Sequence, residues 1–251
     1  MLLFKRIFNF EKSTIAGMSE QRLNQRYTPG ESFPLQASLQ FEGRDWPARI
    51  VNISGYGLGL FLGQHDAAAA KGQTGSVLLT LDHLRLKIPG RIAHAVRLDR
   101  GLSCGFGLLE VDYLRQKSYL QLIQPIAIGQ SLRPVPPELI AQNEPQLIRQ
   151  DFRDDADSLL TVWREISPGS PLHSFEFRMH DYFCKADAQN AVLKAYLRQA
   201  TDSHKGKLSN PVFAHSSGLH DEIRKLLGLI LPNLSAAVPE DLKSFLRKFA
   251  H

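Results

Sequence analysis

The sequence predicts an α+β protein in which a small antiparallel β-barrel is followed by a mainly α-helical C-terminal module. Short alternating apolar stretches separated by glycines fill residues 33–112, whereas apolar residues recur at helical spacing after residue 150. Between these regions, residues 125–150 contain five prolines, which is typical of a connecting segment. A chain of 251 residues is long enough for two such modules.

The predicted barrel begins at residues 33–41, where Leu35, Ala37, Leu39 and Phe41 alternate with polar residues, as in a half-buried strand. A turn at 42–45 leads to a second strand, and a turn at Ser54–Gly57 ends it. Further strands are expected at 58–62, 76–81, 84–88, 91–98 and 103–111. Closely spaced short strands favour a closed barrel, because closure leaves no exposed strand edge.

A helix is expected at 112–123, ending at Pro125, and it closes the barrel domain. After residue 150, four segments carry apolar residues at helical spacing and are expected to pack as a small bundle; they are 159–166, 186–200, 219–231 and 239–249. The predicted organisation is an N-terminal arm at 1–19, a barrel with its closing helix at 20–124, a Pro/Gln-rich linker at 125–150 and a helical module at 151–251.

The composition argues against several classes of protein. A hydrophobic content of 43% and a charged content of 22% are typical of globular domains and not of disordered chains. No apolar run approaches the roughly 20 residues that cross a bilayer, so no transmembrane segment is expected. Cys104 and Cys184 are far apart and belong to no CxxC motif, which predicts a reducing, cytoplasmic location.

The net charge of +5 is unevenly distributed. Residues 1–148 hold 16 Lys and Arg against 12 Asp and Glu, while residues 149–251 hold 14 against 13. This distribution favours a local anionic ligand in the N-terminal half over a broad nucleic-acid surface. A DNA-binding regulator, with a basic face around Lys205 and Lys207, stays open as an alternative.

Two short motifs carry the functional prediction. Arg22 and Arg26 stand four residues apart, and the sequence NISGYG begins at Asn52. In order, spacing and context these motifs resemble the PilZ family, whose signatures are RxxxR before the first barrel strand and [D/N]xSxxG at the turn after the second. The resemblance covers about residues 20–124 and includes the strand at 104–111 with the helix after it. It implies a barrel that binds the bacterial second messenger cyclic di-GMP and needs no cofactor.

The resemblance implies five ligand-binding residues and two further candidates: Arg22, Arg26, Asn52, Ser54 and Gly57, with Gln21 and Gly55 as the further candidates. Arginine suits such a ligand because its planar fork grips a phosphate or the O6/N7 edge of guanine with two hydrogen bonds. Asn52 and Ser54 offer polar groups for a guanine edge, and the two glycines are expected to allow positive φ and close approach. Gln21 leaves the ligand stoichiometry open.

No enzyme active site is predicted. The sequence GYGLG at 55–59 lacks the GxGxxG spacing, and neither GxSxG nor HExxH occurs. His173, His180 and Cys184 match no zinc-ligand spacing, so no metal site is predicted either.

The expected function is therefore that of a cyclic di-GMP receptor that changes conformation and signals to a partner protein through the C-terminal module, in motility, adhesion or exopolysaccharide control. A PilZ adaptor that binds no ligand is the other alternative. The apolar stripe from Leu219 to Leu231 is expected to seal the core of its own module, and the oligomeric state stays open.

Overall fold

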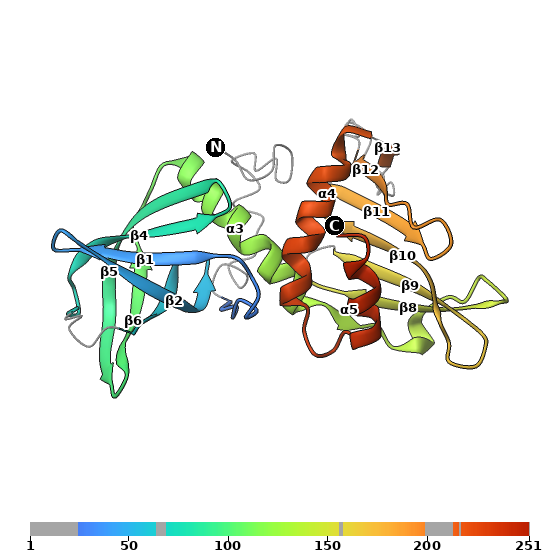
Figure 1. Cartoon of the computed structure of the whole chain (residues 1–251), viewed down its shortest axis with the longest axis horizontal. Helices are drawn as coiled ribbons and strands as arrows, with labels where there is room; N and C mark the ends of the chain where they lie inside the picture. The colour runs from blue at the N-terminus through green and yellow to red at the C-terminus, as the bar shows by residue number, and fades with distance from the viewer. Residues whose placement is uncertain (1–24, 64–68, 156–157, 199–212, 216, 251) are drawn as a thin grey trace. The chain divides into compact units, whose positions relative to one another are not determined.

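Figure 1 shows a computed structural model of the chain, which describes residues 25–63, 69–155, 158–198, 213–215 and 217–250. The predicted N-terminal arm, Gln21 and Arg22 lie outside these residues. The chain divides into two compact units, Met1–Ala127 and Ile128–His251. Each unit is described by itself below.

The first unit contains a closed barrel of six antiparallel strands in the order β1-β2-β3-β6-β5-β4, with β4 pairing back to β1 (Figure 1). This confirms the predicted antiparallel barrel. Its strands are β1 (Gln36–Phe41), β2 (Arg44–Ser54), β3 (Gly57–Leu62), β4 (Thr74–Leu81), β5 (Leu84–Leu98) and β6 (Gly101–Leu108). The two separate strands expected at 84–88 and 91–98 are one continuous strand, β5.

Side chains alternate along each barrel strand between a filled interior and the outer face. In β3, Leu58, Leu60 and Leu62 point inward and are at most 3% exposed, while the residues between them point outward. Because a side chain repeats its direction every two residues, this alternation fixes the pairing register of the strand. The interior is therefore a packed core, and a ligand site on this barrel lies on its outer face.

Helix α3 (Tyr113–Ser131) follows the barrel and contains Pro125 in its interior, so the prediction that Pro125 ends the helix is wrong. A proline inside a helix removes one backbone hydrogen bond and costs about 3 kcal/mol. Burial of apolar side chains on both sides of the proline offsets that cost, since Leu122 and Ile126 are fully buried. The residues expected as a linker thus begin with the end of this helix.

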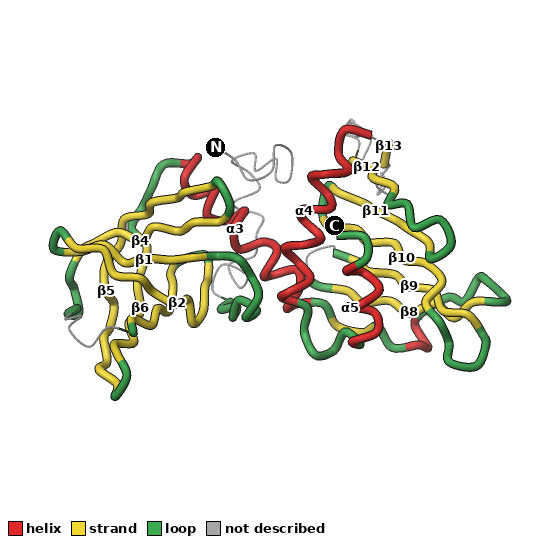
Figure 2. The backbone as a smooth tube through the Cα atoms, in the orientation of Figure 1, coloured by secondary structure: helices red, strands yellow, loops and turns green. Residues whose placement is uncertain are grey.

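The second unit is built on a seven-stranded antiparallel sheet, in which each strand pairs with the next along the chain from β7 to β13 (Figure 2). The prediction of a mainly α-helical module is therefore wrong. The strands are β7 (Arg133–Pro134), β8 (Leu147–Arg153), β9 (Leu159–Glu165), β10 (Leu172–Met179), β11 (Tyr182–Asp187), β12 (Lys194–Arg198) and β13 (Phe213–His215). The 3₁₀ helix η1 (Pro137–Leu139) lies between β7 and β8, within the segment expected as a linker.

The wrong prediction of a helix at 159–166 has an identifiable cause. Leu159, Trp163 and Ile166 match a helical period, but Leu160 and Val162 between them are fully buried on one face of β9. Apolar residues on both faces of a strand hide the polar–apolar alternation by which a strand is recognised. Likewise, where a helix is expected at 186–200, residues 186–198 form the end of β11, a turn and β12.

Two predicted helices near the C-terminus are present, and they pack on one face of the sheet. They are α4 (His220–Ile230) and α5 (Glu240–Arg247), accompanied by the 3₁₀ helices η2 (Ser217–Leu219) and η3 (Leu231–Asn233). The ring of Phe175 on β10 contacts the rings of Phe245 and Phe249, at centroid distances of 6.0 and 5.3 Å. The apolar stripe of α4 is buried within this unit, as expected. In the described part of the chain, no helix has the length and apolar character needed to cross a bilayer.

Candidate functional site

A cavity of about 290 Å³ opens on the outer face of the barrel, over β2, β3, β5 and β6. Four predicted ligand-binding residues, Arg26, Asn52, Ser54 and Gly57, line this one cavity. These four residues therefore lie together, although Arg26 precedes the first strand and the others belong to the end of β2 and the start of β3. Gly55, a further candidate, does not line the cavity. Gln21 and Arg22 lie outside the described residues.

Arg26 is held at the cavity by its neighbour Tyr27. The backbone of Tyr27 forms an antiparallel bridge with Ile53 of β2, through two N–H···O bonds of 2.8 Å. Strand β1 begins only at Gln36, so this bridge uses an edge of β2 that β1 leaves free. Since Tyr27 and Ile53 are also buried, at 4% and 0% exposed, the bridge fixes Arg26 beside Asn52 and Ser54.

The floor of the cavity is a surface of glycine backbone. On β3 and β6, Gly57 is paired directly with Gly107, and Gly59 with Gly105. All four are outward positions, and they line the cavity. A paired row without side chains exposes flat peptide backbone, on which a planar ring can lie at van der Waals distance.

Two β-bulges aim polar side chains over this floor. The register of β2 shifts between Ile50 and Asn52, and that of β5 shifts between Ile92 and His94. A bulge changes the direction of the side chain that follows it. The Asn52 amide lies against Gly59, because a β-carbon at position 59 would be 2.7 Å from its Nδ2.

The imidazole of His94 lies against Gly105 in the same way, because a β-carbon at position 105 would be 2.6 Å from its Nδ1. The two polar side chains thus cover a directly paired glycine couple from opposite sides. Among the described residues, neither side chain has a hydrogen-bond partner, so both are free to bind a ligand.

The turn after β2 is held from below by helix α3. The Tyr119 hydroxyl donates to the carbonyl oxygen of Ser54 at 2.8 Å, and it lies 3.3 Å from that of Gly57. Tyr119 is 1% exposed, and its burial raises its pKa well above the usual range, so it stays a donor. The Ser54 hydroxyl donates to the Gly57 carbonyl at 3.3 Å and accepts from the Tyr56 N–H at 3.4 Å. Ser54 thus shapes the turn as well as lining the cavity.

The glycines of this turn serve a purpose other than the expected one. Neither Gly55 nor Gly57 has a positive φ, so the expected left-handed conformation is wrong. At Gly57 a β-carbon would lie 2.5 Å from the carbonyl oxygen of Phe106 on β6. Glycine is required there because β3 and β6 approach closely. Gly55 lies in the turn between β2 and β3.

The electrostatic character of the cavity suits an anion. Among the described residues, no Asp or Glu lines it, whereas the guanidinium of Arg26 and the imidazole of His94 do. Cys104 also contributes to the lining, but its side chain is 1% exposed and burial raises its pKa to about 11, so it stays a neutral thiol. Among the described residues, no group of three or more His, Cys, Asp or Glu side chains is placed to hold a metal ion.

Sequence reasoning missed His94 and the glycines at 59, 105 and 107. The glycines had a visible signal: in GLGL at 57–60 and CGFG at 104–107, glycine occupies every second position of two expected strands. Such a pattern predicts one strand face without side chains. His94 had no such signal, since the bulge that directs it is a property of strand pairing.

Comparison with known proteins agrees with this description of the barrel. No curated protein matches the chain. Among solved structures, the chain is similar to the crystal structure of the Borreliella burgdorferi PlzA protein in complex with c-di-GMP, with 9% sequence identity and a TM-score of 0.34. The match covers 96% of this chain and 99% of that one. The family model of the PilZ domain matches residues 20–122. Residues 20–122 of this chain are therefore a PilZ domain.

Proposed function

We propose that the cavity on the outer face of the barrel binds cyclic di-GMP and that the protein is a receptor for this second messenger. The observation that carries the proposal is that Arg26, Asn52, Ser54 and Gly57 line a single cavity, which no carboxylate of the described part of the chain lines. These residues belong to the two motifs that resemble the PilZ signatures, in a segment that is a PilZ domain. PilZ domains as a family are associated with this ligand.

The chemistry of the cavity agrees with the ligand. A guanine is planar, and the paired glycines Gly57 and Gly107, beside the Asn52 and His94 side chains, give it flat backbone for stacking. Its polar edge then lies within reach of the Asn52 amide, which both donates and accepts hydrogen bonds. The Arg26 guanidinium supplies a charge-assisted, two-pronged contact to a phosphate or to the O6/N7 edge of guanine. We propose that Arg22 is the second arginine that binds the same ligand.

Calorimetric titration with cyclic di-GMP tests the proposal, with GTP as a control ligand. A charge-assisted contact is worth about 1.5 to 3 kcal/mol, so Arg26→Ala and Arg22→Ala are each expected to weaken binding by about 10-fold or more. Arg85→Ala is the matched control, because Arg85 is an exposed arginine of the same barrel that does not line the cavity. Binding unaffected by the Arg22 and Arg26 changes refutes the assigned site. A folded wild-type protein that binds no cyclic di-GMP favours the adaptor alternative.

We propose further that binding changes the conformation of the segment before β1 and that this change is communicated to a protein partner in motility, adhesion or exopolysaccharide control. The argument rests on Arg26, which directly precedes the bridge between Tyr27 and Ile53. A ligand that grips Arg26 would restrict the backbone on its N-terminal side. Limited proteolysis of residues 20–32 with and without saturating ligand is the test. Equal cleavage rates in both conditions refute the ordering step.

A further inference from the structure

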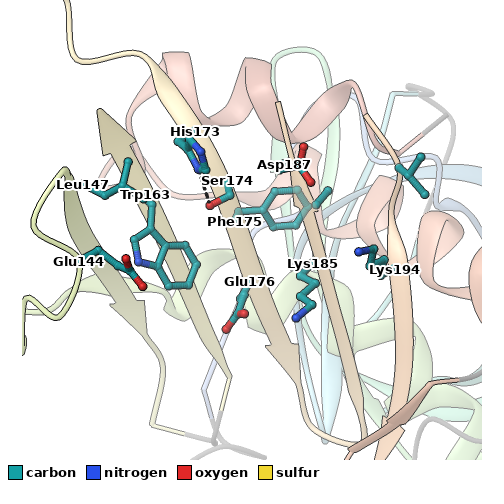
Figure 3. A pocket seen from close by; sticks show the side chains of 12 residues that line it. Glu144, Leu147, Trp163, His173, Ser174, Phe175, Glu176, Lys185, Asp187 and Lys194 are labelled. Atoms are coloured by element: carbon teal, nitrogen blue, oxygen red, sulfur yellow. Dashed lines mark hydrogen bonds between the residues drawn. The ribbon is translucent and has the colours of Figure 1, made fainter. Parts of the chain in front are cut away.

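A second cavity, of about 440 Å³, lies in the unit formed by residues 128–251 (Figure 3). It opens on the face of the sheet opposite to α4 and α5. The side chains of Trp163 and Ser174 belong to this face, because each neighbours in its strand a residue that is buried toward the helices, Val162 and Phe175. Among the described residues, those that line the cavity belong to strands and loops of this unit and none to a helix.

The cavity exists because a small residue separates two larger ones. Trp163, Ser174 and Asp187 stand directly opposite one another on β9, β10 and β11. Side chains in such a row share one face of the sheet. The short Ser174 side chain forms the floor, and the Trp163 indole forms one wall. A bulge between Leu172 and Ser174 turns His173 into the same space, where its Nδ1 lies 3.2 Å from the Ser174 hydroxyl (Figure 3).

Two glutamates line the side of this cavity toward β9 and β10, and two lysines line the side toward β11 and β12, with Glu176 as the direct cross-strand partner of Lys185. The Glu144 carboxylate lies beside the Trp163 indole, and Glu176 projects from the next strand, β10 (Figure 3). Lys185 and Lys194 project from β11 and β12, on the far side from Glu144. None of these four side chains forms an ion pair or a hydrogen bond with another described side chain.

The two lysines form an unusual pair. Lys185 and Lys194 are direct cross-strand partners, an arrangement that like charges destabilise. The Lys185 ammonium lies 5.6 Å from the centre of the Tyr196 ring, which stabilises one of the charges without neutralising it. Two acids lie beside the lysines. Glu176 is the direct cross-strand partner of Lys185 but forms no ion pair with it. Asp187, whose charge interacts with that of Lys194, accepts from the Asn190 backbone at 2.7 Å and from its amide at 3.0 and 3.1 Å. An anion between the lysines would relieve their repulsion.

The other end has the composition of a cation site. The face of an indole attracts an ammonium group through its quadrupole, and carboxylates beside it strengthen that attraction. Trp163 with Glu144 and Glu176 provides both features. Neighbouring strands are about 4.8 Å apart, so the acidic residue on β10 and the basic residue on β12 are separated by about 10 Å at the backbone. The longer side chains of both residues reduce that gap.

We propose that this cavity binds a small zwitterion, with its ammonium group against Trp163 between Glu144 and Glu176 and its carboxylate between Lys185 and Lys194. The proposal goes beyond cyclic di-GMP binding, because every residue that lines the cavity belongs to the second unit. The protein would then have two separate inputs, a nucleotide at the barrel and a small zwitterion at the sheet.

The test uses three probes on the full chain without nucleotide: 6-aminohexanoate, hexylamine and hexanoate. The chain has two tryptophans, so its ¹H–¹⁵N spectrum contains two indole N–H signals, and Trp163→Phe assigns the one that reports on the cavity. We expect 6-aminohexanoate to shift the Trp163 signal in a saturable manner. Each single-charge probe is expected to bind about 10-fold more weakly, since it lacks one charge-assisted contact.

Substitutions assign the two ends. Lys185→Gln combined with Lys194→Gln is expected to reduce 6-aminohexanoate to the affinity of hexylamine, and Glu176→Gln to reduce it toward that of hexanoate. Arg247→Gln, on α5 at the other face of the sheet, is the matched control and is expected to change neither. The proposal is overturned if no probe shifts the Trp163 signal saturably, if hexanoate or hexylamine binds as tightly as the zwitterion, or if the double lysine variant retains full affinity. Cyclic di-GMP titration of the same variants keeps the two proposals distinguishable.

Discussion

Replacing Gly59 by alanine tests whether Asn52 is held in position by the bare backbone of β3. A β-carbon at position 59 would lie 2.7 Å from Nδ2 of Asn52, whereas ordinary contact begins at 3.4 Å. The amide must therefore move by about 0.7 Å, the difference between these distances. The move is possible because the amide is the free end of a side chain with no hydrogen-bond partner among the described residues. We expect the barrel to stay folded while the amide leaves its place over the floor.

The expected loss of cyclic di-GMP affinity follows from the contacts of one amide. Misplacing it forfeits about 1 to 3 kcal/mol, which corresponds to a decrease of about 5-fold to 150-fold. Gly57→Ala provides the contrast, because its β-carbon would lie 2.5 Å from a backbone oxygen that cannot turn away. That change is expected to lower the free energy of unfolding by about 1 to 3 kcal/mol.

The assay combines calorimetric titration with urea unfolding of both variants. Gly63→Ala is the control, because the closest atom to a β-carbon at position 63 is 4.0 Å away. The reasoning is refuted if Gly59→Ala binds as tightly as the wild type, or if it is as unstable as Gly57→Ala. In the first case Asn52 does not contact the ligand. In the second case the β3 backbone, and not the amide, absorbs the added methyl group.

Three further predictions follow from buried or paired groups. Tyr119→Phe removes the donor to the Ser54 carbonyl and is expected to cost about 1 to 3 kcal/mol in thermal unfolding, so an unchanged midpoint would contradict the assigned role of the hydroxyl. The pKa of Asp241 is lowered, chiefly by its hydrogen bond to Arg164 and with a 2.7 Å ion pair, so this carboxylate stabilises the fold above its unfolded pKa of about 3.9 and loses that effect as the pH falls below it. Because the Asp241 side chain is 55% exposed, Asp241→Asn is expected to cost about 1 kcal/mol or less at pH 6, and the cost is expected to disappear as the pH falls through the lowered pKa of the folded protein, as measured by urea unfolding. Burial raises the pKa of Cys184 to about 12, so this thiol is expected to react with a disulfide reagent only after denaturation, and rapid reaction in the native state would contradict its burial.

The sequence predicted the barrel, and it placed most of the candidate site residues on one turn, because the signals involved are local. Alternation in 33–62 identifies strands whose outer face is polar or glycine and whose inner face is apolar. The motif at Asn52–Gly57 lies on a single turn, so its residues had to be close to one another. That Arg26 joins them depends on the bridge at Tyr27, which the sequence does not display and which the structure provides.

The second unit was mispredicted because its strands carry large side chains on both faces. Leu159, Trp163 and Ile166 match a helical period, although Leu160 and Val162 fill the buried face of β9. A helix and a two-faced strand cannot be distinguished by apolar spacing alone, and the choice is made by pairing with neighbouring strands. The prediction that the helix ends at Pro125 was wrong for a similar reason. The proline costs the helix about 3 kcal/mol locally, but the burial of apolar side chains in the folded protein outweighs that cost.

The sequence by itself determined which residues of this protein have the chemistry to grip an anion, since residue type and spacing are written in the chain. The tertiary structure decided where that chemistry acts. Strand pairing produces the bulges before Asn52 and His94 and places the paired glycines between them. It also produces the cavity around Ser174, with glutamates on one side and lysines on the other. Pairing joins residues far apart in the chain, and local sequence patterns carry no information about such partners.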